Sequence, residues 1–355
     1  MKKREPVYIR IYEKIKEEIV EGIYEKGAKL PSKRTLAETS GVSIITIEHA
    51  YSLLCEEGYV ESKERSGYFV IFKKEDGFEY SLNKLNTGYL MEERKEKEEI
   101  NFPVSVMAKT MRGVISDLQE NIFLTSPAKG CLELREGIRR YLERNRGISV
   151  QTEQIIVGAG AEYLYHLIPD LLGKDKVYGI EIPSYEKIEQ SYTNQGVEIE
   201  RIPMTKEGMD SGYLKNSKAD VLHISPYRSY PTGITATASK KYEYIRWAQK
   251  EGRFLVEDDF ESEFSLLKKK EETLFSLSKE KNVIYMNTFS KTISSSLRIG
   301  YMVLPKDILE VYDKVLGYCS CPVPTYMQRV VARLIDNGDF ERHINRIRRK
   351  KRKEG

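Results

Sequence analysis

The chain has 355 residues, of which 40% are hydrophobic and 32% charged, and its formal net charge is +4. This length suggests two domains, and the composition excludes a chain that is disordered throughout. No apolar run approaches the ~20 residues that a bilayer span requires, and the basic N-terminus is not followed by a signal-peptide core. Four scattered cysteines and four histidines without regular spacing predict reduced thiols, a cytoplasmic protein and no metal site.

Residues 5–72 alternate short helical patterns with turn residues. Apolar residues recur at four-residue spacing from Ile11 to Ile19 and predict a first helix. Ser32 and Ser43 each precede a further helical pattern, so each is predicted to cap a helix. Two strand-like runs then flank residues 63–67 and predict a hairpin. Three helices followed by a two-stranded wing predict a winged helix-turn-helix domain.

Residues 73–100 are rich in charge and predict a linker with a short helical piece. From residue 101 onward, strand-like and helical stretches alternate, a pattern typical of an α/β domain with a mainly parallel sheet. The predicted strands are Ile155–Val157, Val177–Ile182, Val221–Ile224, Phe254–Val256, Val283–Met286 and Gly300–Val303. The predicted parts are therefore a DNA-binding domain over 5–72, a linker over 73–100, an α/β domain over 101–345 and a basic tail over 346–355.

The basic tail holds seven Lys or Arg residues in the eight positions from Arg346 to Lys353. It is expected to form either an exposed helix end or a frayed tail, and we favour the frayed tail. Either form would have weak, non-specific affinity for nucleic acid, because its charges would bind phosphates without reading bases.

The N-terminal pattern predicts contacts with double-stranded DNA. A helix-turn-helix places its second helix in the major groove, while helix N-termini and basic side chains hold phosphates. The predicted contacts lie at the leading ends of the second and third helices and in the wing: Lys33, Arg34, Ser43, Thr46, His49, Lys63, Arg65 and Gly67. Residues 1–75 contain 14 basic and 13 acidic residues, so we expect modest affinity from one monomer and a gain from dimerisation. Such helical bundles also mediate protein contacts, which is the alternative interpretation.

The α/β domain carries a second pattern, which suits pyridoxal 5'-phosphate (PLP). That cofactor needs a lysine for the Schiff base, a carboxylate beside the ring nitrogen, a stacking ring and phosphate donors. Lys291, Asp258 and Tyr185 can supply the first three, and each follows or ends a predicted strand. The candidate phosphate ligands are Thr288, Ser290, Arg298, Gly160 and Ala161. Each of these residues alone has an ordinary structural explanation, and only their joint order supports the prediction.

Two sets of motifs carry a resemblance to known families. Lys29-Leu30-Pro31-Ser32-Lys33-Arg34, Gly41-Val42-Ser43 and Glu57-Gly58-Tyr59-Val60 closely resemble GntR-type transcription factors. Glu257-Asp258-Asp259 and Thr288-Phe289-Ser290-Lys291, with Leu297-Arg298-Ile299-Gly300-Tyr301, resemble fold-type I aminotransferases. The combination resembles the MocR/GabR subfamily of GntR regulators. This resemblance implies that Lys291 is the Schiff-base lysine, Asp258 the partner of the ring nitrogen, Tyr185 the stacking ring and Arg298 a phosphate ligand. It also implies a homodimer.

Several positions depart from the family pattern. Ile44 stands where Arg is common, so a phosphate or base contact is missing. Phe260 replaces a Tyr and loses a hydrogen bond to the cofactor, typically worth about 1 kcal/mol. Lys187 replaces an Arg that would bind a substrate carboxylate bidentately. Arg228 and Ser229 replace a common His-Gln or His-His pair. By this resemblance we expect the small C-terminal subdomain of the family to be absent from residues 1–355.

Three hypotheses follow from the sequence. The favoured one is a DNA-binding transcriptional regulator whose aminotransferase-like domain binds PLP, or a PLP–amine adduct, as its effector without turnover. Such a protein would control vitamin B6 or amino-acid metabolism. The alternatives are a working PLP-dependent aminotransferase and a DNA-binding regulator whose degenerate large domain serves only dimerisation.

Overall fold

A computed structural model describes residues 6–63, 66–72, 102–250, 252–266, 272–279 and 281–354. These residues form two compact units, with a division between Glu96 and Lys97. The predicted linker over 73–100 and the wing residue Arg65 lie outside the described residues. None of the helices in the described ranges combines the length and the apolar character that a membrane crossing requires.

The N-terminal unit contains three helices and a two-stranded antiparallel hairpin, as predicted. Its elements are α1 (Val7–Val20), α2 (Lys33–Ser40), α3 (Ile44–Glu56), β1 (Val60–Lys63) and β2 (Gly67–Val70). The hydroxyl oxygens of Ser32 and Ser43 each accept a hydrogen bond from the backbone three residues on, which fixes where α2 and α3 begin. The apolar faces of the helices meet in one small core around the fully buried Ile47 and Tyr51.

The larger unit is built on a mixed, mostly parallel sheet with the strand order β3-β10-β9-β8-β7-β4-β5-β6. Strand β10 runs antiparallel to both β3 and β9, and β6 runs antiparallel to β5. The strands are β3 (Ile155–Gly158), β4 (Val177–Ile182), β5 (Glu198–Thr205), β6 (Gly208–Met209), β7 (Val221–Ile224), β8 (Phe254–Asp258), β9 (Val283–Thr288) and β10 (Gly300–Val303). All six predicted strands are therefore confirmed, and β5 and β6 are additional.

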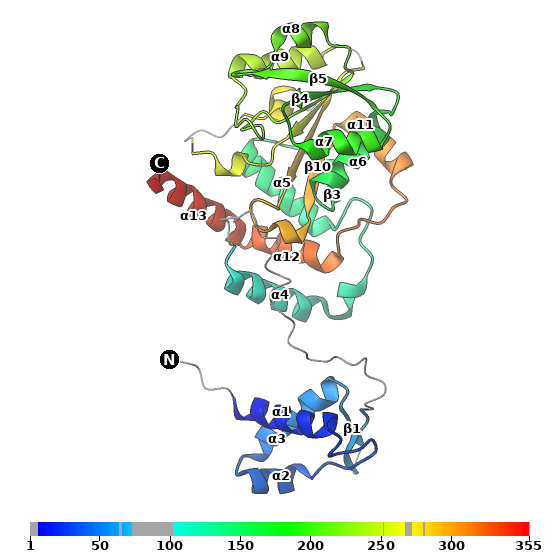
Figure 1. Ribbon diagram of the computed structural model, residues 1–355, viewed down its shortest axis with the longest axis vertical. Helices are drawn as coiled ribbons and strands as arrows, with labels where there is room; N and C mark the ends of the chain where they lie inside the picture. Colours follow the sequence, from blue (N-terminus) through cyan, green and yellow to red (C-terminus); the bar gives the residue numbers. More distant parts are fainter. Residues whose placement is uncertain are drawn as a thin grey trace. The chain divides into compact units, whose positions relative to one another are not determined.

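Helices cover both faces of this sheet, because successive buried strand residues point to opposite sides. One face packs against α6 (Ala161–Leu172), α7 (Glu186–Asn194) and α11 (Lys306–Val315). Figure 1 shows the strands passing between this set and α5 (Leu132–Arg146). The other face packs against α5, α9 (Ala238–Ala248), α10 (Leu274–Leu277) and α12 (Thr325–Asp336). The remaining helices are α4 (Val104–Leu118), α8 (Ser211–Asn216) and α13 (Asp339–Glu354).

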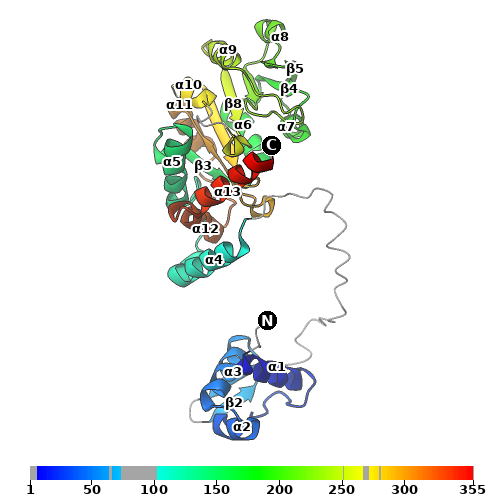
Figure 2. The same cartoon turned by 90° about the vertical axis from the view of Figure 1, so that its left-hand side faces the viewer.

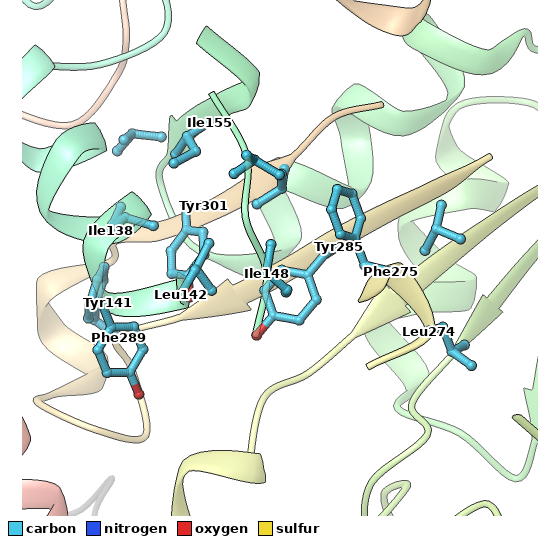
Figure 3. Packing of buried hydrophobic residues seen from close by; sticks show 14 of the residues in the cluster. Ile138, Tyr141, Leu142, Ile148, Ile155, Leu274, Phe275, Tyr285, Phe289 and Tyr301 are labelled. Carbon is cyan, nitrogen blue, oxygen red and sulfur yellow. The ribbon is translucent and has the colours of Figure 1, made fainter. Parts of the chain in front are cut away.

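The core on the second face is rich in aromatic side chains. Tyr285 of β9 and Tyr301 of β10 are fully or almost fully buried and pack with Phe289, which follows β9 (Figure 3). Ile138 and Leu142 of α5 cover these rings. The core therefore packs against the end of β9, where some of the predicted cofactor residues lie.

The basic tail is helical, which corrects the expectation of a frayed segment. Helix α13 runs from Asp339 to Glu354, includes the whole basic run, and lies beside α12 (Figure 2). Arg348, in the middle of the run, is half-buried and its Nε donates to the backbone oxygen of Glu263 at 2.6 Å. The helix persists because it is anchored to the rest of the unit.

Candidate cofactor site and DNA-binding surface

The ends of four neighbouring strands meet at one edge of the sheet. Asp258 is the last residue of β8 and Thr288 the last residue of β9. Gly300, the first residue of the antiparallel β10, pairs with Thr288 on one side and with Gly158, the last residue of β3, on the other. This register gathers the predicted acidic, hydroxyl and glycine-rich segments along one edge, where open α/β sheets bind ligands.

The Asp258 carboxylate is buried and held by a chain of polar side chains. The hydroxyl of Tyr165 donates to its Oδ2 at 2.5 Å, and His223 Nε2 lies 3.6 Å from the same oxygen. The other ring nitrogen of His223 is hydrogen-bonded to the hydroxyl of Tyr192 at 2.7 Å. Burial, followed by the charge of Asp258, raises the pKa of Tyr165 well above its ordinary value, so this hydroxyl keeps its proton and remains a donor. These side chains together fix the orientation of the Asp258 carboxylate.

A candidate anion-binding region lies where α6 begins. Gly160 precedes α6 with φ +90°, and the guanidinium of Arg298 lies directly over it. A Cβ at Gly160 would be 2.9 Å from Nη2 of Arg298 and would displace that guanidinium, and the positive φ favours glycine at this position. The start of α6, at Ala161, has no side-chain cap, so its first-turn N–H groups are available to an anion. The structure thus places Arg298 against Gly160, next to Ala161, and their role as phosphate ligands stays a prediction.

Glu162, which the sequence did not single out, occupies this anion-binding region. Its Oε2 accepts from Arg298 Nη2, and its Oε1 accepts from Lys187 Nζ at 2.6 Å. Burial opposes ionisation of Glu162, but the hydrogen bonds from Lys187 and Arg298 outweigh it and lower its pKa to about 2. Glu162 is therefore a carboxylate anion at neutral pH and bridges two cations.

Tyr185 lies beside this bridge. It is half-buried and immediately precedes α7, and its ring meets that of Tyr230 edge to face with centroids 6.0 Å apart. The Lys187 ammonium lies 5.8 Å from the centre of the Tyr185 ring. The predicted stacking ring and the predicted Arg-to-Lys substitution are therefore neighbours.

Ser290 and Lys291 lie in the turn that follows β9. Ser290 is half-buried and Lys291 is exposed, and Lys291 makes no hydrogen bond or ion pair with any residue that the structure describes. The turn is anchored by Phe289, whose N–H donates to the carbonyl of Ile299 at 2.9 Å. Phe260, two residues beyond Asp258, is half-buried. The structure shows no contact that joins Lys291 to Asp258, so their joint action stays a prediction.

These groups fit PLP in two independent respects. His223 Nε2 is a buried polar atom without a hydrogen-bond partner among the described residues, and it lies beside the carboxylate predicted for the ring nitrogen. At the other end, the glycine that accommodates Arg298 and the start of α6 make a set of donors suited to a phosphate. Phe260 fits PLP less well than the Tyr that the resemblance leads one to expect, because it lacks the hydroxyl.

The predicted DNA contacts lie on the N-terminal unit as expected, except for Arg65, which lies outside the described ranges. Lys33 and Arg34 open α2, and Lys33 Nζ is 2.6 Å from a carboxylate oxygen of Glu48 on α3. Lys63 ends β1 and pairs with Glu61 at 2.9 Å. Two of the basic side chains predicted to hold phosphates are therefore paired within the domain.

The remaining predicted contacts form the start of α3 and the wing. The hydroxyls of Ser43 and Thr46 are hydrogen-bonded to each other at 2.8 Å. The His49 ring lies edge to face against Tyr8 at 5.7 Å. Gly67, with φ +109°, opens β2. These residues shape the surface of the domain, and Ser43, Thr46 and His49 are each engaged within it.

Comparison with known proteins agrees with both units. Residues 7–70 match the family of bacterial regulatory proteins called the gntR family, and residues 94–354 match aminotransferase class I and II. The HTH-type transcriptional regulator YdeL of Bacillus subtilis is 31% identical over 98% of this chain and 77% of its own length. The chain belongs to the MocR/GabR subfamily of GntR-type regulators.

Further relatives of this GntR-type regulator extend the comparison. The pyridoxine biosynthesis transcriptional regulator PdxR of Corynebacterium glutamicum is 26% identical over 96% of the chain and 75% of its own length. The structure of kynurenine aminotransferase from Pyrococcus horikoshii, in complex with PMP, superposes with a TM-score of 0.62 and 25% identity. That likeness covers 70% of the regulator, and the regulator spans 64% of the enzyme.

Two further buried carboxylates, Glu181 and Asp259, lie near Asp258 in this GntR-type regulator. Glu181 of β4 accepts from the hydroxyl of Ser229 at 2.6 Å and from the N–H of Ser225 at 3.3 Å. Burial nevertheless raises its pKa to about 8. On the opposite side, Asp259 forms a buried ion pair with Arg146. Neither group was predicted from the sequence, since each owes its role to partners more than 40 residues away along the chain.

Proposed function

We propose that this transcriptional regulator binds PLP, or a PLP–amine adduct, in its aminotransferase-like domain and uses it as the effector that controls DNA binding. The observation that carries the proposal is the placement of Arg298 over Gly160 at the start of α6, on the same sheet edge as the buried Asp258. A phosphate group and a protonated ring nitrogen would each find a complementary partner there.

Each residue has a distinct part in this proposal. When bound, PLP supplies an aldehyde that can condense with a primary amine. Lys291 presents an exposed amine in the turn after β9. Asp258 would hold the proton of the ring nitrogen, with Tyr165 fixing the carboxylate at 2.5 Å. Tyr185 would lie against the ring.

Sensing is favoured over turnover by one specific contact. Lys187, which stands where the resemblance leads one to expect a carboxylate-binding Arg, is engaged by Glu162 at 2.6 Å. A substrate carboxylate would have to displace that anion and would find an ammonium in place of a bidentate guanidinium. Ligand control then requires only that PLP bind two arrangements of the protein with different affinity.

The relatives support a proposed physiological role. PdxR carries pyridoxine biosynthesis in its name, and its resemblance extends over nearly the whole chain. We therefore propose regulation of vitamin B6 or amino-acid metabolism. We also propose a homodimer, which would present two DNA-binding domains to a two-fold operator.

The test is a titration of the purified full chain with PLP, followed by absorbance in the visible range. Wild type should develop a saturable band, and reduction with borohydride should fix the cofactor at Lys291. Lys291→Ala should lose the saturable band, whereas Lys306→Ala, which removes another exposed lysine, should keep it.

DNA binding of the same preparations, measured with and without PLP, tests the effector role. PLP should change the affinity of wild type and leave that of Lys291→Ala unchanged. A chain that binds DNA but shows no band at saturating PLP would be a regulator whose large domain serves only dimerisation. Steady conversion of an amino donor to its keto acid would instead establish an enzyme.

A further inference from the structure

The outward face of α3 has an unusual composition for a surface that meets DNA. Ile44 is 45% exposed and Ile45 is 65% exposed, and the Glu48 side chain is 53% exposed. Spacings of three and four residues place Glu48 on the same side of the helix as both isoleucines. The face therefore offers two branched apolar groups and one carboxylate, and no Lys or Arg.

The orientation of this face is fixed by the core. Ile47, Ala50, Tyr51 and Leu54 are each fully buried and form the opposite side of α3. Rotation of the helix would expose these residues, at a cost of roughly 1.5–3 kcal/mol for each large apolar side chain. The exposed isoleucines are thus held outward by the fold.

The polar residues near the start of α3 are less available for contacts with bases. The hydroxyl of Ser43 accepts from the N–H of Thr46 at 3.2 Å and is hydrogen-bonded to its hydroxyl. The ring of His49 lies against Tyr8. Ile44, Ile45 and Glu48 are therefore exposed side chains of α3 that a partner can contact.

Glu48 is held by a cation from the neighbouring helix. Lys33 Nζ lies 2.6 Å from its Oε1, and this hydrogen bond keeps the pKa of Glu48 below its usual range. The ammonium offsets the repulsion between this carboxylate and the phosphates, so an acid can remain at a DNA-facing position. The pair also keeps the carboxylate ionised, and therefore purely an acceptor of hydrogen bonds.

The chemistry of the major groove selects the bases that suit such a face. Thymine presents a methyl group there, and cytosine presents an N4 amino donor with no adjacent acceptor on the same base. In the major groove guanine presents only acceptors, which repel a carboxylate. Adenine presents an N6 amino donor beside the N7 acceptor, and N7 would also repel the carboxylate. We propose that α3 reads thymine methyl groups through Ile44 and Ile45 and a cytosine amino group through Glu48. This inference rests on the DNA-binding role of the domain.

The test begins with duplexes that the full-length wild-type protein selects from a random library. In the selected site, each thymine is replaced by deoxyuracil, which removes only the methyl group. At the contacted positions the replacement should weaken wild-type binding about fourfold, as expected for one buried methyl group. Ile44→Ala or Ile45→Ala should remove this sensitivity at its own position. Ile23→Ala is the matched control, because Ile23 is also 65% exposed but lies outside α3.

Glu48 is tested by its base preference. Every single base-pair substitution of the selected site is measured with wild type and with Glu48→Gln. The variant should shift the preference at one position from cytosine to adenine, since an amide pairs with the N6 and N7 edge. Glu13→Gln, which alters an exposed carboxylate on α1, should leave all preferences unchanged.

The outcomes separate this inference from the DNA-binding role. If wild type binds its selected site but neither deoxyuracil nor Glu48→Gln changes the pattern, base reading by this face is refuted and DNA binding stands. If wild type enriches no duplex at all, the DNA-binding role itself fails and the inference fails with it.

Discussion

Glu162 should compete with PLP for Arg298, and Glu162→Gln should therefore bind the cofactor more tightly. The carboxylate of Glu162 contacts both Arg298 and Lys187 at the start of α6, in the region proposed for the phosphate. Glutamine preserves the size of the side chain but removes its charge. A phosphate would then meet an unopposed guanidinium and would no longer face a neighbouring anion.

The size of the effect follows from the exposure of the pair. The side chain of Glu162 is 24% exposed and that of Arg298 is 50% exposed, so solvent screens their interaction. An ion pair of this kind is worth up to about 1 kcal/mol. A free-energy difference of 1.4 kcal/mol changes a dissociation constant tenfold, so release of a pair worth about 1 kcal/mol should lower the dissociation constant for PLP about fivefold.

The competition should persist across the range of a practical assay. The pKa of Glu162 is lowered to about 2, so its charge is complete at neutral pH. Since the pKa in the folded state lies below that of the unfolded chain, its ion pairs stabilise the fold above pH 4.5. That stabilisation is lost as the pH falls from 4.5 toward 2. A titration between pH 6 and 8 therefore measures the ionised carboxylate throughout.

The assay is a PLP titration by absorbance on wild type, Glu162→Gln and Glu186→Gln. Glu186 is an exposed carboxylate in the first turn of α7, next to Lys187, and serves as the control. We expect about fivefold tighter binding for Glu162→Gln alone, with a smaller gain at high salt. Equal or weaker binding by Glu162→Gln would refute the competition and show that the carboxylate supports the site.

Three further substitutions test other parts of the site. Gly160→Ala should destabilise the fold by about 1–2 kcal/mol in denaturant melts, because alanine is strained at φ +90°, and should weaken PLP binding, because its Cβ would displace the Arg298 guanidinium. Gly147→Ala, with φ +66° and open space around it, should cost stability only. Equal PLP binding by both variants would contradict this reasoning. Tyr165→Phe should lose about 1–2 kcal/mol of stability and weaken PLP binding, because Asp258 loses the hydrogen bond from the Tyr165 hydroxyl. An unchanged affinity for PLP would count against this positioning role of Tyr165. Burial raises the pKa of Glu181 to about 8, above that of the unfolded chain, so its contribution to stability falls as the pH rises from about 4.5 to 8. The stability advantage of Glu181→Gln over wild type should therefore grow by up to about 1.4 kcal/mol for each pH unit between 4.5 and 8. A difference between the two melts that does not change with pH would contradict the raised pKa of Glu181.

The fold was largely predictable because its signals are local. Continuous apolar runs revealed the buried parallel strands, and serines before apolar patterns revealed the caps of α2 and α3. Strand β5 escaped prediction because it lies near the edge of the sheet, where only Ile202 is buried. The charged residues and Pro203 within it hide its pattern. The helical state of the basic tail was also missed, since it depends on an anchor distant in the sequence.

The candidate site was predictable only in part. Arg298 and Gly160 were named from their order along the chain, and the structure brings them together. Tyr165 and His223 were not named, because each looks like a core residue in its own segment and acquires its role only beside Asp258. A polar histidine inside an otherwise apolar strand was the one available signal. The deciding contacts arise from tertiary packing, which a single sequence does not display.

The hydrogen bond from Arg348 to the backbone of Glu263 has a mechanical consequence. Glu263 lies five residues beyond Asp258, so α13 and the carboxylate at the cofactor face share one short stretch of backbone. This hydrogen bond ties the position of the basic helix to the loop that follows β8, so the two must shift together or lose the contact.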